Sequence, residues 1–136
     1  MMVGETNLDK LLGSMSAELM DGLYVFATLS ESEMPIGVRP RMMFHEAEGM
    51  TLILLKEEAE AHGLAYEFPC RMITLNIHSS LDAIGFLARI TQRLAALNMG
   101  VNPVSGFYHD HLFIPLDRAD EALAELKLMS AELSAS

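Results

Sequence analysis

The sequence predicts an α+β fold, in which helices cover one face of antiparallel β-sheet and the chain forms two βαββα-type units. In the second half, the hydrophobic pattern changes from the twofold period of a strand to helical spacing, then to two strands and a final helix. The first half follows the same order, with a polar loop in place of its first helix. Both halves have a hairpin connection at the matching place, near Glu48 and Asp110. These observations indicate a repeat of elements.

The first half begins with a short helix and a short extended piece. Asn7 can act as the N-cap of a helical turn that Gly13 ends, and residues 15–20 follow as extended chain. The β-branched and aromatic side chains of residues 23–29 predict a buried strand. The remaining elements predicted in this half are a loop (30–40), two strands (41–46 and 50–56) joined by a turn (47–49), and a helix (57–62).

The second half has the clearer periodicity. Residues 71–78 alternate, with Ile73, Leu75 and Ile77 on one side, which predicts a strand with one buried face. From residue 82 to residue 98 the apolar residues have helical spacing. The last predicted elements are strands at 101–108 and 111–116, a tight turn at His109 and Asp110, and a helix that Asp117 caps.

Units of this kind place a layer of helices on one face of an antiparallel sheet, which is the ferredoxin-like arrangement. That arrangement needs a fourth strand, but the second unit ends soon after its last helix. An unpaired edge invites association. We therefore expect another segment to pair there, either residues 15–20 or a strand exchanged between the halves. The two predicted units are residues 1–68 and residues 69–136, and the first is a degenerate unit in which a loop replaces the first helix.

Charge and composition exclude several kinds of partner. Of 136 residues, 9 are Lys or Arg and 19 are Asp or Glu, which gives a net charge of −10. Such a chain is poorly suited to nucleic acids and to anionic membrane surfaces. No apolar run approaches the ~20 residues of a membrane span, and the first residues lack a secretory pattern, so we expect a cytoplasmic protein. The single cysteine, Cys70, is expected to fill the core as a small hydrophobe.

The sequence contains none of the common catalytic motifs. It has no phosphate-binding glycine loop, dinucleotide fingerprint, His-Glu-x-x-His or Gly-x-Ser-x-Gly pattern. We therefore expect a protein that is not an enzyme and that has no cofactor.

One segment is suited to binding a small anion. Residues 79–87 join a strand to the start of a helix, where free backbone N–H groups and the helix dipole favour a carboxylate. Gly85 would allow close approach in the first helical turn. Plain capping of the helix by Ser80 or Asp82 explains the same residues. His78 directly precedes this loop and could line the same pocket.

Two other clusters each allow two interpretations. His109 and His111 could share a metal ion with Asp110 or Tyr108 nearby. A polar hairpin tip in which Asp110 takes the turn conformation also explains them, and a structural zinc site needs four ligands. We therefore predict no metal site. Arg39 and Arg41, on either side of Pro40, could bind an anion or form a solvated loop.

Residues 79–87, 101–108 and 108–115 resemble the small bacterial proteins that consist of tandem ACT domains. Related modules look like those of cytosolic arginine sensors in animal cells. The resemblance implies regulatory binding of a small metabolite, often an amino acid, between ACT units. No biosynthetic enzyme or transcription regulator is attached here, which departs from the usual ACT arrangement. The site residues implied by the resemblance are Ser79, Ser80, Asp82, Ile84, Gly85, Phe86, Asn102, Val104 and Ser105.

The function that we expect is therefore a non-catalytic regulatory protein that binds a small molecule such as an amino acid. The alternatives are a metal-binding protein or metal-dependent enzyme that uses His109 and His111, and a purely structural assembly subunit. We also expect a homodimer, formed through sheet edges or helix faces.

Overall fold

The computed structural model describes residues 3–77 and 84–134. The elements in chain order are α1 (Val3–Ser14), β1 (Ser16–Leu19), β2 (Tyr24–Leu29), the 3-10 helix η1 (Glu31–Glu33), β3 (Met42–His45), β4 (Met50–Leu55), α2 (Lys56–Ala61), β5 (Glu67–Asn76), α3 (Phe86–Ala95), β6 (Asn102–Ser105), β7 (Asp110–Pro115), the 3-10 helix η2 (Leu116–Arg118) and α4 (Ala119–Ser134). No helix within these two ranges is long and apolar enough to cross a membrane.

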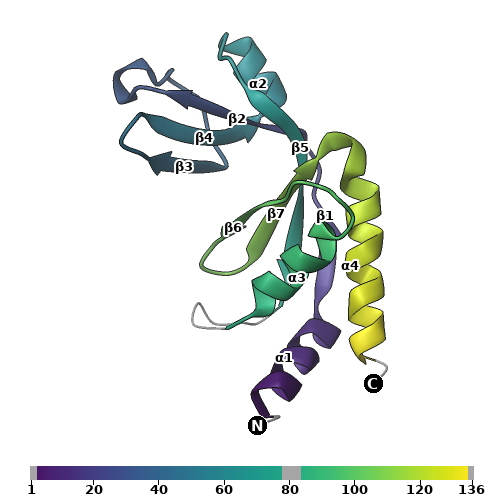
Figure 1. Ribbon diagram of the computed structural model, residues 1–136. Helices are drawn as coiled ribbons and strands as arrows, with labels where there is room; N and C mark the ends of the chain where they lie inside the picture. The colour runs from purple at the N-terminus through teal and green to yellow at the C-terminus, as the bar shows by residue number, and fades with distance from the viewer. Residues whose placement is uncertain (1–2, 78–83, 135–136) are drawn as a thin grey trace.

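The described strands form one curled antiparallel sheet in the order β3-β4-β2-β5-β7-β6, and β1 pairs with β5 (Figure 1). The first unit, with α2, has the strand order β5-β2-β4-β3. The second unit, with α1, α3 and α4, has the matching order β1-β5-β7-β6. The predicted ferredoxin-like architecture with antiparallel strands is confirmed.

The strand that completes the second unit is β1, which lies within the predicted segment 15–20. Leu19 pairs with Ile73, and the Met20 N–H donates to the Met72 carbonyl at 2.9 Å. Farther along, Tyr24 of β2 pairs with Cys70. The long strand β5 therefore closes the first unit at its start and opens the second unit at its end. The strand exchange expected between the halves is found in β1, a strand of the first half that completes the second unit.

The proposed boundary between residues 68 and 69 falls inside this shared strand. The register between β2 and β5 shifts there, and Phe68 has a φ of 57°, as in a β-bulge. The Phe68 ring packs edge-on against Phe26, with 5.7 Å between the ring centroids. The two units are therefore joined by a bent strand, with no linker between them.

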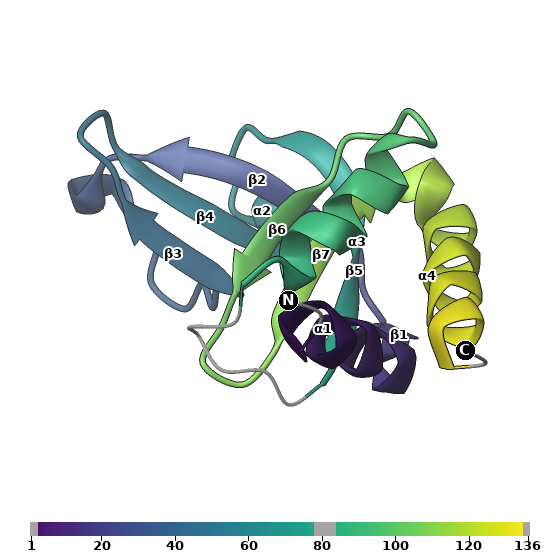
Figure 2. The ribbon, with the colours of Figure 1, turned by 60° about the horizontal axis from the view of Figure 1, so that its bottom comes forward.

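The helices lie on one face of the sheet, as predicted. Val25 and Ala27 of β2 pack with Ala59 of α2 in the first unit. Leu112 and Ile114 of β7 pack beneath α1, α3 and α4 in the second unit. Figures 1 and 2 show these three helices around the second half of the sheet, with both chain ends at the same end of the molecule.

The opposite face of the sheet, here called the helix-free face, folds on itself and buries a third core. This core contains Tyr24, Ile53, Cys70, Met72 and Phe113. The Phe113 ring meets Tyr24 and Phe26 edge-on, with centroids 5.9 and 6.0 Å away. Side chains of β2 and β7 therefore hold the two units together.

Several predicted boundaries were wrong. The first helix begins at Val3, ahead of Asn7, and β5 begins at Glu67. The third helix ends at Ala95 and is followed by Asn98 with a φ of 60°, a conformation that asparagine tolerates better than most residues. The apolar pattern predicted a helix to residue 98, because the turn residues that follow Ala95 continue the helical spacing.

The predicted turn at His109 and Asp110 was also wrong. The Gly106 N–H donates to the His109 carbonyl at 2.9 Å, so Phe107 and Tyr108 form the loop. Each of these rings is 80% exposed. The sequence favoured a strand here because aromatic residues have high β-propensity.

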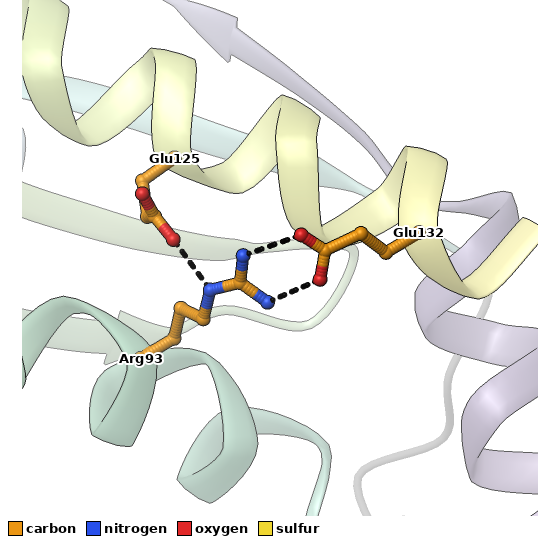
Figure 3. A network of polar contacts seen from close by, with 3 residues as sticks. All are labelled: Arg93, Glu125 and Glu132. Carbon is orange, nitrogen blue, oxygen red and sulfur yellow. Dashed lines mark hydrogen bonds and ion pairs between the residues drawn. The ribbon is translucent and has the colours of Figure 1, made fainter.

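A cluster of one arginine and two glutamates joins α3 and α4 of the second unit (Figure 3). The Arg93 Nε donates to Glu125 at 2.5 Å, and its two terminal nitrogens each donate to a Glu132 oxygen at 3.1 Å. The hydrogen bond from Arg93 is the main reason that the pKa of Glu132 lies below its usual value. This geometry is the bidentate form of a guanidinium–carboxylate pair.

Replacing Arg93 with Met should lower the free energy of unfolding at pH 7 by less than a core substitution, because the cluster is partly exposed, so that water and salt screen its charges. A carboxyl with a lowered folded pKa stabilises the protein above its unfolded pKa, and this stability is lost as the pH falls through the folded pKa. Urea denaturation should therefore show that the difference between wild type and Arg93→Met shrinks below the usual pKa of glutamate. Lys127→Met, which removes an α4 cation without an ion pair among the described residues, should show no such pH dependence.

Candidate functional site

The predicted ligand loop follows the C-terminal end of β5. Its residues Ser79, Ser80 and Asp82, together with His78, lie outside the described residues. The other three loop residues differ in exposure: Ile84 is 89% exposed, whereas Phe86 is 2% exposed and packs in the helix-covered core. Gly85 precedes α3 with a φ of 86°, a conformation in which a side chain would be strained.

The predicted residues of β6 lie on both faces of the sheet. Asn102 pairs with Phe113 and Val104 with His111, so both lie on the helix-free face, opposite α3. Ser105 pairs with Asp110 and lies on the same face as the helices. Because β5 and β6 both run antiparallel to β7, which lies between them, their C-terminal ends are at the same end of the sheet. Ser105 therefore lies at the end of the sheet where β5 stops.

A cavity of about 350 Å³ lies at this end of the sheet. It is lined by Leu11, Ser14, Asn76, Ile77 and His109. These residues come from the end of α1, the end of β5 and the β6–β7 hairpin. Ile77, which only His78 separates from the predicted ligand loop in the sequence, is thus one of the residues that line the cavity.

The polar side chains of this cavity are a hydroxyl, an amide and an imidazole. The Ser14 hydroxyl donates to the Leu11 carbonyl at 3.0 Å, so its oxygen remains able to accept. The Asn76 side-chain amide has no hydrogen bond within residues 3–77 and 84–134. The Nδ1 atom of His109 is buried, also without a partner among those residues. A buried polar atom without a partner costs stability, so a ligand that supplied one would be favoured.

The α1 helix borders the start of α3 as well as the cavity. A Cβ at Gly85 would lie 3.4 Å from Cδ2 of Leu8, and Arg89 of α3 pairs with Asp9 at 3.3 Å. Sequence reasoning did not identify α1 as part of the site, because its short apolar pattern indicated only a helical turn. It missed Asn76 because that residue was one polar position within a strand.

The two hairpin histidines have different environments. The Nδ1 atom of His111 lies 3.0 Å from the Thr74 hydroxyl. The centroids of the His109 and His111 rings are 6.4 Å apart, and the two rings are nearly perpendicular. Burial is the main reason that the pKa of His111 lies below its usual value, and electrostatic interactions with His109 and Arg41 lower it further. Across residues 3–77 and 84–134, no group of three or more His, Cys, Asp or Glu residues could hold a metal ion.

The cysteine is a core residue, as predicted. Cys70 is fully buried, and its thiol donates to the Tyr24 carbonyl at 3.3 Å. Burial raises the pKa of Cys70 to about 12. The thiol therefore stays protonated near neutral pH and is a poor nucleophile.

Comparison with known proteins identifies the family. Two families described as ACT domain match residues 3–71 and 67–127, and the matches overlap within β5. A Vibrio cholerae protein of unknown function, described as a possible transport protein, is 38% identical with a TM-score of 0.85, and the match covers 93% of this chain and 98% of that one. No curated protein matches the chain.

More distant solved structures share the fold. An Agrobacterium tumefaciens protein has 17% identity and a TM-score of 0.69, with 85% of this chain and 89% of that chain covered. The regulatory subunit of aspartate kinase from Thermus thermophilus, in ligand-free form, has 12% identity and a TM-score of 0.64, with 83% and 95% covered. With its two matches in tandem, the chain belongs to the ACT-domain family.

Proposed function

We propose that this protein is a non-catalytic regulatory protein that binds an amino acid at the end of β5. ACT domains are typically regulatory modules for small ligands, and the Thermus thermophilus relative is a regulatory subunit. The observation that carries the proposal is the cavity lined by Leu11, Ser14, Asn76, Ile77 and His109, since only His78 separates Ile77 from the predicted ligand loop in the sequence.

The chemistry of this cavity suits a small zwitterion. Leu11 and Ile77 offer apolar surface to a side chain, and Asn76 offers both a donor and an acceptor. The C-terminal end of the 12-residue helix α1 lies at the cavity, and its dipole favours an ammonium group. The ligand carboxylate would meet the loop of Ser79, Ser80, Asp82 and Gly85, as the family resemblance implies. The net charge of −10 favours a neutral or cationic amino acid over an acidic one.

The proposal includes a cytoplasmic homodimer. Strands β3 and β6 are the two ends of the described strand order, so each has an outer edge without a partner within the described chain. Residue 103 in β6 is proline, which has no N–H to donate to a neighbouring strand. We therefore expect pairing through this edge to be short, and the mass in solution tests whether a dimer forms.

A thermal-shift panel of the twenty L-amino acids tests the ligand proposal. One of them should raise the melting temperature saturably, since a ligand at 100 times its dissociation constant adds ~2.7 kcal/mol to the free energy of unfolding. Asn76→Ala and His109→Ala should weaken this effect. The control His62→Ala removes an exposed histidine after α2 and should leave it unchanged. A panel without any saturable shift, or a shift that both cavity variants retain in full, would contradict the proposal.

A further inference from the structure

A second polar cavity lies in the first unit. It has a volume of about 330 Å³ and is lined by Tyr24, Arg39, Pro40, Arg41 and Leu55. These residues come from the start of β2, the end of β4 and the chain that enters β3. The cavity shares no lining residue with the one at the end of β5.

Arg41 is held in place by a buried phenol. Its Nη2 donates to the Tyr24 hydroxyl at 2.5 Å, and its guanidinium carbon lies 5.4 Å from the centroid of that ring. The Tyr24 side chain is only 2% exposed and is fixed by the third core. The Arg41 backbone N–H also donates to the Ile53 carbonyl. The position of this cation is therefore set before any ligand arrives.

The two guanidiniums of the cavity have no carboxylate partner within the described ranges. Arg89, Arg93 and Arg118 each pair with an aspartate or a glutamate, but neither Arg39 nor Arg41 does. Glu58 is close, but its carboxylate oxygens accept the backbone N–H of Arg39, each at 3.3 Å. In a chain with a net charge of −10, two neighbouring cations therefore remain free to bind an external anion.

We propose that the cavity of Arg39, Arg41 and Tyr24 binds a small dianion, either a phosphate or a dicarboxylate. Guanidiniums present paired N–H donors that match the oxygens of both groups. Because the Tyr24 oxygen accepts from Arg41, its own proton is available to the same anion. This site goes beyond the proposed function, because the first unit would bind an anion, whereas the cavity at the end of β5 is proposed to favour a neutral or cationic amino acid.

Isothermal titration calorimetry on the full chain tests this site, with inorganic phosphate and malonate as probes at constant ionic strength in chloride. Wild type should bind at least one probe saturably, and the tighter probe identifies the chemical class. Arg39→Gln and Arg41→Gln should each weaken binding about tenfold, the loss expected for one charge-assisted hydrogen bond. Tyr24→Phe keeps the ring and should weaken binding several-fold.

Lys127→Gln is the matched control, because it removes one positive charge from exposed α4 and should bind like wild type. Equal affinities for this control and the arginine variants, or no saturable heat with either probe, would overturn the proposal. Arg39→Gln keeps the test decisive if Arg41→Gln fails to fold, because the Arg39 guanidinium makes no hydrogen bond among the described residues. Arg39→Gln should still respond to amino acids as wild type does, which separates this site from the cavity at β5.

Discussion

Phe113→Ala should lower the free energy of unfolding by about 3–5 kcal/mol, the usual cost of removing a buried phenylalanine. The side chain is 1% exposed and touches the rings of both Tyr24 and Phe26. Its removal would leave a cavity between β2 and β7, and it would also remove two edge-to-face ring contacts. Because those strands belong to different units, the loss would loosen the junction between them. Urea denaturation followed by circular dichroism measures the change.

Phe107→Ala is the matched control for this substitution. Phe107 is 80% exposed at the tip of the β6–β7 hairpin, where its ring contacts Tyr108 and no other aromatic ring among the residues that the structure describes. We expect its replacement to change stability by about 0.5 kcal/mol or less. If Phe113→Ala and Phe107→Ala lowered the free energy of unfolding by similar amounts, the claim that the third core holds the two units together would be wrong.

Ile73→Ala should destabilise the protein by about 2–5 kcal/mol. Ile73 is fully buried in the core of the second unit, and it pairs with Leu19 of β1 and Leu112 of β7. It lies on β5, the strand that the first unit uses as its last. The substitution should therefore weaken both units together, because a shared strand makes their unfolding cooperative.

Hydrogen exchange read by mass spectrometry tests this coupling. Amides of β4 in the first unit and β7 in the second should lose protection to a similar extent in Ile73→Ala. The control Ile36→Ala, at a side chain that is 98% exposed, should leave both strands as protected as in wild type. Loss confined to β7 would show that the units unfold independently.

The sequence predicted the fold well because strand and helix periods are local properties. The alternation of Ile73, Leu75 and Ile77 identified the second half of β5 and its buried face correctly. The start of the same strand was missed, since Pro69 and the bulge at Phe68 interrupt the period. The missing fourth strand of the second unit indicated that residues 15–20 would pair there, as β1 does. The use of β5 as the last strand of the first unit is a separate long-range pairing, which the sequence analysis did not predict.

The candidate site was less predictable from the sequence. The strand–helix connection around Gly85 was proposed from its chemistry. Only the fold brings Leu8 of α1 beside Gly85, and places Asn76 in a cavity with the end of α1. Asn102 and Val104 could be placed on a strand but not on a face, because their orientation depends on register with β7. The Arg39 and Arg41 pair was noticed as a possible anion site, while the buried Tyr24 that positions Arg41 was 17 residues away in the chain.

An NMR titration of the uniformly ¹⁵N-labelled chain with L-amino acids tests the proposed function most directly. Binding at the end of β5 should shift the amide signals of Ser14, Ile77, Gly85 and His109 saturably, with a single dissociation constant. Residues of the first unit, such as Arg39, should respond little. If no amino acid shifts these signals, or if the changes gather in the first unit instead, the assignment of an amino-acid site to this cavity is wrong.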